Sequence, residues 1–294
     1  MRCLMMIDSI DLSVRRPRAR VSSNIQIATQ GGCRMSTDAD QTLPSMVPPE
    51  GSRLAVIGGS GGMGRVLVRA AEDIDLQVAA IDLPKSLEEF PPSDDVWSIA
   101  CDATDESSVA AVFDAINDRW GAVDHVVNFV GFTKTRVSVE NMNLADWQEV
   151  VDGCLTSAFL VARYSIPLLR RGDGPTLLNT SSTFGVLVGQ SGYGAYASSK
   201  AAIINLTRAL STECNPDIRV NAIAPGLIDT EFLSGGTGRE RRPSNLDFDA
   251  VVETLPMRRI GRPEDIAAMA LFLASPAASY VTAQTIHVNG GLWS

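Results

Sequence analysis

The amino-acid sequence predicts an α/β fold: a doubly wound parallel sheet of about seven strands with helices on both faces. Two observations predict it. From Arg53 onward, short apolar runs alternate with segments of helical period, and a glycine-rich loop follows the first apolar run. Each crossover helix returns the chain to the same end of the sheet, so the strands of such a chain lie parallel.

The predicted strands are short runs rich in aliphatic residues, bounded by turn-forming or polar residues. They span residues 54–57, 78–81, 97–100, 125–128, 177–179, 219–223 and 284–288. Segments with apolar residues three and four positions apart are predicted to be helices. These span residues 65–72, 107–119, 147–170, 197–214 and 263–274.

The chain length and composition fit one globular domain with a tail: 294 residues, 45% hydrophobic and 20% charged. We expect residues 1–50 to be a disordered N-terminal extension. They mix Arg-rich, Ser/Thr/Gln and Pro-containing pieces and show no sustained period. Residues 51–294 are expected to form the single folded domain.

The charge pattern argues against nucleic acid as a partner. The net charge is −9, and residues 1–34 hold six Arg and two Asp, so residues 35–294 carry a net charge of −13. No apolar run reaches about eighteen residues, the length that spans a membrane. We therefore expect neither nucleic-acid binding nor a membrane span.

The cysteines and histidines predict no metal centre. Five cysteines, an odd number without a close pair, indicate neither a disulfide framework nor a zinc site. A reducing cytoplasm is the compartment that fits such cysteine usage. His125 and His287 lie in strand-like runs and are interpreted as structural residues.

The glycine-rich loop lies between a predicted strand and a predicted helix, which is the setting of a dinucleotide-binding fingerprint. Glycines permit a tight turn and let the backbone approach a pyrophosphate at the helix N-terminus. Two registers of the glycine spacing fit, and a tight structural turn is the alternative interpretation. The loop residues expected at a cofactor are Gly58, Ser60, Gly61, Gly62, Met63 and Gly64.

Two aspartates follow the next two strands. Asp82 lies about twenty residues beyond the loop, where a carboxylate accepts from ribose hydroxyls and repels a 2′-phosphate. This position favours NAD over NADP as the cofactor. Asp102 is placed to meet the adenine amino group, or else it is a helix-capping or loop aspartate. Leu83 and Ala103 are expected beside them.

A second group of polar residues lies around a long predicted helix. Tyr196 and Lys200 are four positions apart and would share one helix face. A nearby ammonium favours the phenolate, so we expect Lys200 to lower the pKa of Tyr196. An ordinary solvated pair is the alternative interpretation. The strand just upstream ends in hydroxyls that include Ser182.

Together these residues resemble the short-chain dehydrogenase/reductase family in its single-domain form, which has a Rossmann fold. The resemblance covers residues 53–292 and includes a C-terminal signature at residues 259–265 and 289–291. The matching motif residues are Gly58, Gly62 and Gly64, Asp102, the set Ser182, Tyr196 and Lys200, and the cofactor-closing loop Pro225, Gly226 and Thr230.

The resemblance implies an NAD-dependent oxidoreductase that interconverts a secondary alcohol and a ketone. Tyr196 would be the acid/base, Ser182 would hold the substrate oxygen, and Lys200 would bind the nicotinamide ribose. A small-molecule alcohol or ketone is the implied partner, with a homo-oligomer, a tetramer or dimer, as the assembly. Further cofactor contacts implied by the resemblance are Asn128, Val130, Gly131, Tyr196, Lys200, Pro225, Gly226, Ile228 and Thr230.

The sequence departs from the family pattern at three places. Ile57 replaces a usual Thr, Asn128-Phe129-Val130-Gly131 replaces Asn-Asn-Ala-Gly, and Cys154 stands where the family carries a helix-distorting Asn. A thiol is a poor hydrogen-bond partner, so the implied proton relay is in question. A non-catalytic nucleotide-binding sensor on the same fold is therefore the rival function.

Residues 231–255, rich in Gly, Arg and Pro, follow the cofactor loop and are expected to form a mobile lid over the pocket. Three arginines in this segment, Arg239, Arg241 and Arg242, are open to two interpretations. Either they would bind an anionic substrate, or they belong to a charged, solvent-exposed stretch of the chain. The substrate itself is not specified by any motif.

Overall fold

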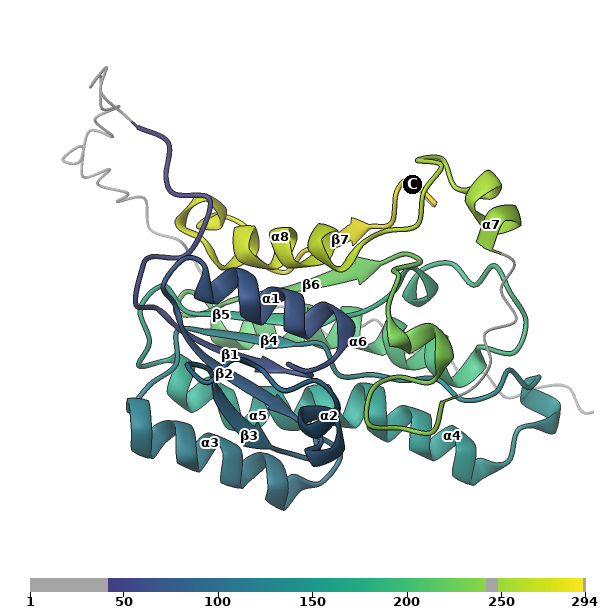
Figure 1. Cartoon of the computed structure of the whole chain (residues 1–294), viewed down its shortest axis with the longest axis horizontal. Coiled ribbons are helices and arrows are strands. Elements are labelled where there is room, and N and C mark those ends of the chain that lie inside the picture. Colours follow the sequence, from purple (N-terminus) through teal and green to yellow (C-terminus); the bar gives the residue numbers. More distant parts are fainter. Residues whose placement is uncertain (1–41, 242–247, 293–294) are drawn as a thin grey trace, which may run out of the picture. The chain divides into compact units, whose positions relative to one another are not determined.

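The computed structural model describes residues 42–241 and 248–292. Within these ranges seven parallel strands form one sheet in the order β3-β2-β1-β4-β5-β6-β7 (Figure 1). The strands are β1 (Arg53–Ile57), β2 (Gln77–Asp82), β3 (Trp97–Ala100), β4 (His125–Asn128), β5 (Thr176–Thr180), β6 (Arg219–Pro225) and β7 (Thr285–Val288). The doubly wound fold is confirmed, and each predicted strand is present within two residues at either end.

Two hydrophobic cores cover the two faces of the sheet, because successive strand residues point to opposite sides. In β1, Leu54 and Val56 pack into one core, and Ala55 and Ile57 into the other. The first core is completed by α1 (Gly62–Glu72) and α8 (Pro263–Ala274). The second is completed by α3 (Glu106–Trp120), α5 (Ser157–Leu169) and α6 (Gly194–Cys214).

Two short helices were not predicted from the sequence, α2 (Pro84–Glu89) and α7 (Phe248–Thr254). Each is shorter than two full turns, so neither shows enough of a helical period to be recognised. Helix α2 begins at Pro84, whose fixed φ suits the first helical position.

The prediction of one regular helix over residues 147–170 is wrong. The chain forms α4 (Leu144–Val151), then a π-helical turn at Asp152–Thr156, then α5. The Ser157 hydroxyl lies 3.2 Å from the carbonyl oxygens of both Gly153 and Cys154. A π-turn widens the helix locally and is frequent at functional sites, so the distortion expected from the family Asn is present with Cys154 in its place.

The compact unit that contains the sheet begins at Leu43. The Ser45 carbonyl accepts a hydrogen bond from Ala277 N at 3.0 Å, and Pro48 is buried. Residues 43–50, which the sequence placed in the N-terminal extension, thus belong to this unit. The remainder of that expectation falls on residues 1–41, which lie outside the described ranges.

The sheet order places a topological switch point between β1 and β4. Strands β2 and β3 lie on one side of β1, and β4 to β7 lie on the other. The loops after β1 and β4 therefore diverge, leaving a crevice at the carboxyl ends of the strands where such folds bind ligands. The glycine loop and the Asn128–Gly131 segment border this crevice.

At the opposite end of the sheet, His125 is a buried residue that makes stability depend on pH. Its Nδ1 lies 3.0 Å from Thr176 Oγ1, and burial lowers its pKa from 6.5 to about 4. Asp124 and Asp173 oppose this shift, while Arg219 adds to it. The folded protein thus binds fewer protons than the unfolded chain, so stability is lost as the pH falls from 6.5 towards 4.

We expect the free energy of unfolding to fall by about 2 kcal/mol between about pH 7 and pH 5 because of His125. Urea unfolding at both pH values measures it. The variant His125→Asn, which does not titrate in this range, should lose most of that dependence. Equal pH dependence in the two proteins would show that other groups cause it.

Candidate active site

The glycine loop is a close-packed backbone cradle between β1 and α1. Gly58 has φ +83°, a conformation that L side chains rarely adopt. A Cβ on Gly64 would lie 1.9 Å from Gly58 O, and a Cβ on Gly62 would lie 2.5 Å from Thr230 Cγ2. Glycine is thus required at each of these positions, which are the three that match the family register.

Asp82 ends β2 with its carboxylate turned toward the glycine loop. One oxygen accepts from Ser60 N at 2.9 Å and the other from Leu83 N at 2.8 Å. Desolvation raises the pKa of Asp82, and the Leu83, Ser60 and Gly61 backbone N–H groups oppose that rise. The backbone therefore holds the carboxylate in one orientation beside the loop.

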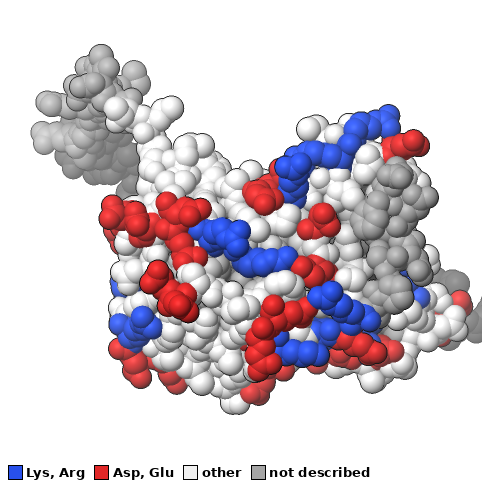
Figure 2. Space-filling model, viewed as in Figure 1, with Lys and Arg blue, Asp and Glu red and all other residues white. Residues whose placement is uncertain are grey.

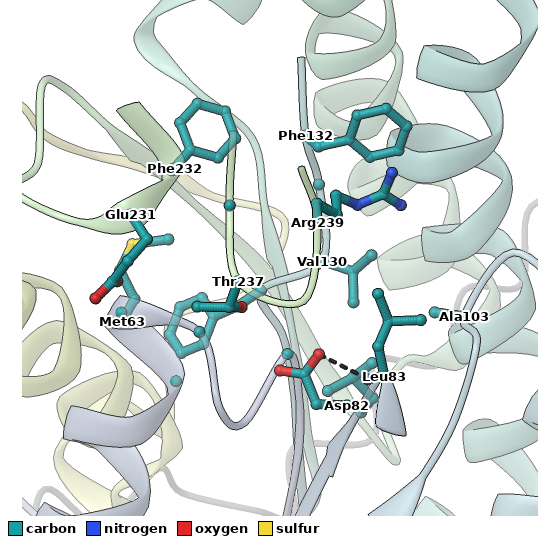
Figure 3. A pocket seen from close by; sticks show the side chains of 18 of the residues that line it. Met63, Asp82, Leu83, Ala103, Val130, Phe132, Glu231, Phe232, Thr237 and Arg239 are labelled. Carbon is teal, nitrogen blue, oxygen red and sulfur yellow. Dashed lines mark hydrogen bonds between the residues drawn. The ribbon is translucent and has the colours of Figure 1, made fainter. Parts of the chain in front are cut away.

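A cleft runs from the glycine loop toward the end of β4 (Figure 3). Many of the predicted cofactor residues line it: Gly58, Gly61, Gly62, Met63, Gly64, Asp82, Leu83, Asp102, Ala103, Val130, Gly131 and Thr230. Ser60 lies just behind the lining, with its hydroxyl buried and without a hydrogen-bond partner among the described residues.

Two predicted cofactor residues hold local turns. Asp102 Oδ1 accepts from the backbone N and the hydroxyl of Thr104 at 2.9 and 2.7 Å. Asp102 therefore stabilises its own loop, as a loop aspartate would, and also lines the cleft. Asn128 Oδ1 accepts from Val130 N at 3.0 Å and lies behind the lining, where it shapes the turn after β4.

Ser182, Tyr196 and Lys200 meet beyond the β4 end of the cleft. Ser182 follows β5 and its Oγ accepts from Phe184 N at 3.1 Å in a 3-10 turn, Thr183–Gly185. The turn packs on α6, because a Cβ on Gly185 would lie 2.8 Å from the Lys200 backbone. Tyr196 and Lys200 share the buried face of α6, with Lys200 Nζ 5.6 Å from the Tyr196 ring centroid.

The expected lowering of the Tyr196 pKa is wrong for the free protein. Burial raises the pKa of Tyr196, the neighbouring Cys154 thiol adds to the rise, and a hydrogen bond with Ser182 opposes it. Burial likewise lowers the pKa of Lys200, whose Nζ donates to Thr180 O at 2.8 Å. Desolvation disfavours the charged form of both groups, so Tyr196 is a protonated phenol at neutral pH.

The predicted loop after β6 runs from the sheet edge to the cleft. Pro225 O accepts from Thr183 Oγ1 at 3.1 Å, which joins β6 to the turn that carries Ser182. Gly226 packs against Asn289, where a Cβ would lie 2.8 Å from the Asn289 Cα. Ile228 is buried and Thr230 alone of this group lines the cleft.

Residues 231–241, here called the strap, cross the cleft. At the start of the strap, Glu231 forms a two-bond ion pair with Arg65 of α1, at 2.7 and 3.0 Å. Further along, Gly238 N donates to Glu89 of α2 at 3.2 Å, and Arg241 pairs with the same carboxylate. The strap is thus attached to both helices that flank the cofactor end of the cleft.

The structure separates the three arginines of the predicted lid. Arg239 lines the cleft, while the Arg241 side chain is 66% exposed and points to Glu89. Arg242 lies outside the described residues, as does the segment 242–247 of that lid. Of the two described arginines, Arg239 is the one whose position remains compatible with the first interpretation, binding of an anionic substrate.

Sequence reasoning missed several residues that line the cleft, among them Phe132, Phe232 and Thr237. Phe132 follows Gly131 directly, so its position after a strand end was the available signal. Phe232 and Thr237 lie in the strap, which has no helical or strand period to place them. Thr237 Oγ1 lies 4.0 Å from where a Cβ of Gly61 would be, directly over the glycine loop.

Cys154 is fully buried and joins the π-turn to the loop after β4. Its Sγ lies 3.4 Å from Phe132 O, and the Phe132 ring would be 2.0 Å from a Cβ on Gly153. A Cβ on Gly131 would lie 3.6 Å from the thiol and 2.9 Å from Lys200 Nζ. Cys154 therefore packs in the wall between the cleft and Lys200.

The surface carries mixed charge around this region. Figure 2 shows basic and acidic side chains interleaved on the face it displays. Among the described residues, no three or more His, Cys, Asp or Glu are placed to hold a metal ion, and no helix is long and apolar enough to span a membrane.

Comparison with known proteins identifies the family. The family model described as enoyl-(acyl carrier protein) reductase matches residues 58–293. The chain belongs to the short-chain dehydrogenase/reductase family. This membership makes it an oxidoreductase that binds a nicotinamide cofactor, and the resemblance seen in the motifs is confirmed.

Other short-chain dehydrogenases/reductases match over most of their length. The 3-oxoacyl-[acyl-carrier-protein] reductase of Vibrio cholerae is 29% identical over 248 residues, 83% of this chain and 98% of the relative. The cis-4-hydroxycyclohexanecarboxylate dehydrogenase of Sinomonas cyclohexanicum is 32% identical and covers 81% and 96%. A crystal structure of a Brucella melitensis member, titled a glucose/ribitol dehydrogenase, has a TM-score of 0.76 at 28% identity and covers 84% and 99%.

Proposed function

We propose that the protein is an NAD-dependent oxidoreductase that interconverts a secondary alcohol and a ketone. The observation that carries the proposal is the convergence of Ser182, Tyr196 and Lys200 beyond one end of a cleft whose other end is the glycine cradle. Ser182 follows β5, whereas Tyr196 and Lys200 both lie on α6; Tyr196 and Lys200 are buried and Ser182 is half-buried.

The residues of the cleft fit a dinucleotide. The glycine cradle at the N-terminus of α1 suits a pyrophosphate, and Asp82, which lines the cleft beside it, would accept from ribose hydroxyls. When bound, NAD⁺ would take a hydride from the carbinol carbon, so that an alcohol and NAD⁺ give a ketone, NADH and a proton. Lys200 and Thr230 would hold the nicotinamide end of the cofactor.

The chain's own groups supply the proton chemistry. Because burial keeps Tyr196 protonated, its hydroxyl is ready to donate to a ketone oxygen in the reduction direction. Ser182 would hold that oxygen by a second hydrogen bond. For alcohol oxidation Tyr196 must first lose its proton. The positive charge of a bound NAD⁺ nicotinamide ring would favour this deprotonation. The protonated phenol is thus the form that ketone reduction requires.

The relatives support this reaction class. The Vibrio cholerae protein is named for reduction of a 3-oxoacyl group and the Sinomonas protein for dehydrogenation of a ring alcohol. Both names describe a ketone and secondary-alcohol pair. Turnover of the purified protein with NAD or NADH and a panel of such pairs tests the proposal. Nucleotide binding without turnover of any pair would favour the sensor.

Cofactor selectivity tests the role of Asp82. We expect the protein to bind NAD more tightly than NADP, because the carboxylate would repel a 2′-phosphate. Asp82→Asn keeps an acceptor for Ser60 N and removes the charge, so NADP affinity should rise by at least about tenfold. Calorimetric titration with both cofactors measures it. Tighter NADP binding by the unaltered protein would overturn the assignment.

A further inference from the structure

We propose that the substrate carries an apolar ring next to the reacting carbon, and that Phe232 of the strap selects for this ring. The proposal rests on the proposed function and specifies its substrate class. Four aromatic side chains support it, here called the aromatic row: Phe232, Tyr196, Tyr193 and Phe184. Phe232 also lines the cleft, at the same end as Phe132 (Figure 3).

The aromatic row connects the strap to the turn that follows Ser182. The ring centroid of Phe232 lies 5.9 Å from that of Tyr196, with an interplanar angle of 49°. On the other side, the Tyr193 ring lies 6.3 Å from Tyr196 at 61°, and 4.8 Å from Phe184 at 66°. These are the inclined arrangements that aromatic pairs prefer. Tyr196, the proposed acid/base, thus has an aromatic neighbour on either side.

The reacting carbonyl group would lie beside the aromatic row. Ser182 and Tyr196 are hydrogen-bonded to each other, and a ketone oxygen would accept from both hydroxyls. Phe184 follows Ser182 by two positions, and its backbone N donates to Ser182 Oγ at 3.1 Å. The substituents of the reacting carbon would therefore lie against rings of the aromatic row.

A small cavity beside Tyr196 offers room for such a substituent. Its lining combines residues of the loop after β4, α4 and the start of α6, and the apolar members include Met142, Val150 and Tyr193. These three belong to the same hydrophobic cluster as Tyr196. The lining also contains Lys134 and Asp146, which form an ion pair with each other. An apolar group in this cavity would be removed from water, which is favourable.

Contacts of the neighbouring residue hold Phe232 in its position. Glu231 forms the two-bond ion pair with Arg65 of α1, and both of these side chains are partly buried. The chain then turns back on itself, so that Gly236 N donates to Glu231 O at 2.9 Å. Phe232 is therefore ordered in the free protein, and a preorganised wall lowers the entropic cost of binding.

A polyol and a long flexible chain are the contrasting substrate classes. Polyol hydroxyls placed against aromatic faces would lose hydrogen bonds to water. A flexible chain would lose rotational freedom that a ring does not have. Both comparisons favour a ring beside the aromatic row.

The test uses the full-length protein with NADH, which forms a non-reacting complex with an alcohol. The probes are 1-phenylethanol, octan-2-ol, which has the same number of carbon atoms in a chain, and the polyol xylitol. By calorimetry, 1-phenylethanol should bind about 3- to 10-fold more tightly than octan-2-ol, the range that an aromatic pair contributes beyond its buried area. Xylitol should bind at least about tenfold more weakly than 1-phenylethanol.

Two variants test the aromatic row itself. Phe232→Leu and Phe184→Leu each keep an apolar side chain and remove one ring. Each should bring the ratio of the 1-phenylethanol and octan-2-ol affinities closer to one and leave NADH affinity unchanged. Phe159→Leu is the matched control, because Phe159 lies on α5 and is 47% exposed. It should keep the original ratio.

Equal or tighter binding of octan-2-ol or xylitol by the unaltered protein would overturn the proposal, as would failure of 1-phenylethanol to bind. An unchanged ratio in both Phe232→Leu and Phe184→Leu would do the same. Turnover of alcohol and ketone pairs with NAD or NADH is measured in parallel. Turnover of chain or polyol pairs alone would leave the proposed function in place and overturn only the ring.

Discussion

Replacing Tyr196 by Phe should lower turnover by about 1000-fold and leave NAD affinity nearly unchanged. The change removes one hydroxyl that would donate or accept the substrate proton, and general acid/base groups contribute on the order of 10²- to 10⁴-fold. The ring itself remains to pack against Phe232. Steady-state turnover and NAD titration of the same preparation measure the two quantities.

Tyr193→Phe is the matched control for that experiment. Tyr193 lies one helical turn before Tyr196 and contacts Phe184 with ring centroids 4.8 Å apart. Its hydroxyl has no proposed role in proton transfer, so turnover should remain within a few-fold of the original. Near-normal turnover by Tyr196→Phe would remove the catalytic assignment and leave the nucleotide sensor as the better interpretation.

A methyl group at Gly64 should weaken NAD binding by about 10- to 100-fold, because overpacking of a rigid site costs about 1–3 kcal/mol. The added Cβ would meet Gly58 O at 1.9 Å, and a backbone atom cannot rotate away as a side chain can. The loop would have to open where the pyrophosphate is expected. Titration of Gly64→Ala with NAD measures the loss, and thermal unfolding shows whether the fold survives.

Gly189→Ala provides the comparison, since no atom lies within 4 Å of a Cβ at that position. It should bind NAD as the unaltered protein does. If Gly64→Ala also binds NAD with unchanged affinity, the cradle does not hold the cofactor.

The strands and the long helices could be predicted because their burial imposes a period on the sequence. The alternation of Leu54, Ala55, Val56 and Ile57 between two cores is one example. Residues with a fixed backbone requirement, such as Gly58 with its positive φ, could likewise be identified from their spacing. In each case a local pattern carries the information.

The features that the sequence did not reveal depend on contacts between distant segments. The raised pKa of Tyr196 results chiefly from burial by residues of several elements, which the spacing of Tyr196 and Lys200 in the sequence does not reveal. Within the π-turn, Gly153 packs against Phe132, a residue 21 positions away in the sequence. Arg239 and Arg241 look alike in the sequence, and only the path of the strap distinguishes them.

The two hydrogen bonds of Asp82 constrain how cofactor preference can change during evolution or design. Its carboxylate accepts from the backbone of Ser60, a fully buried residue of the glycine loop. Exchanging Asp82 for a small apolar residue would leave that buried N–H unpaired, at a cost of about 1–3 kcal/mol. Substitutions toward NADP binding that keep a hydrogen-bond acceptor at position 82 therefore preserve the glycine loop. Substitutions that remove the acceptor require another partner for Ser60 N, and hence a rearranged loop.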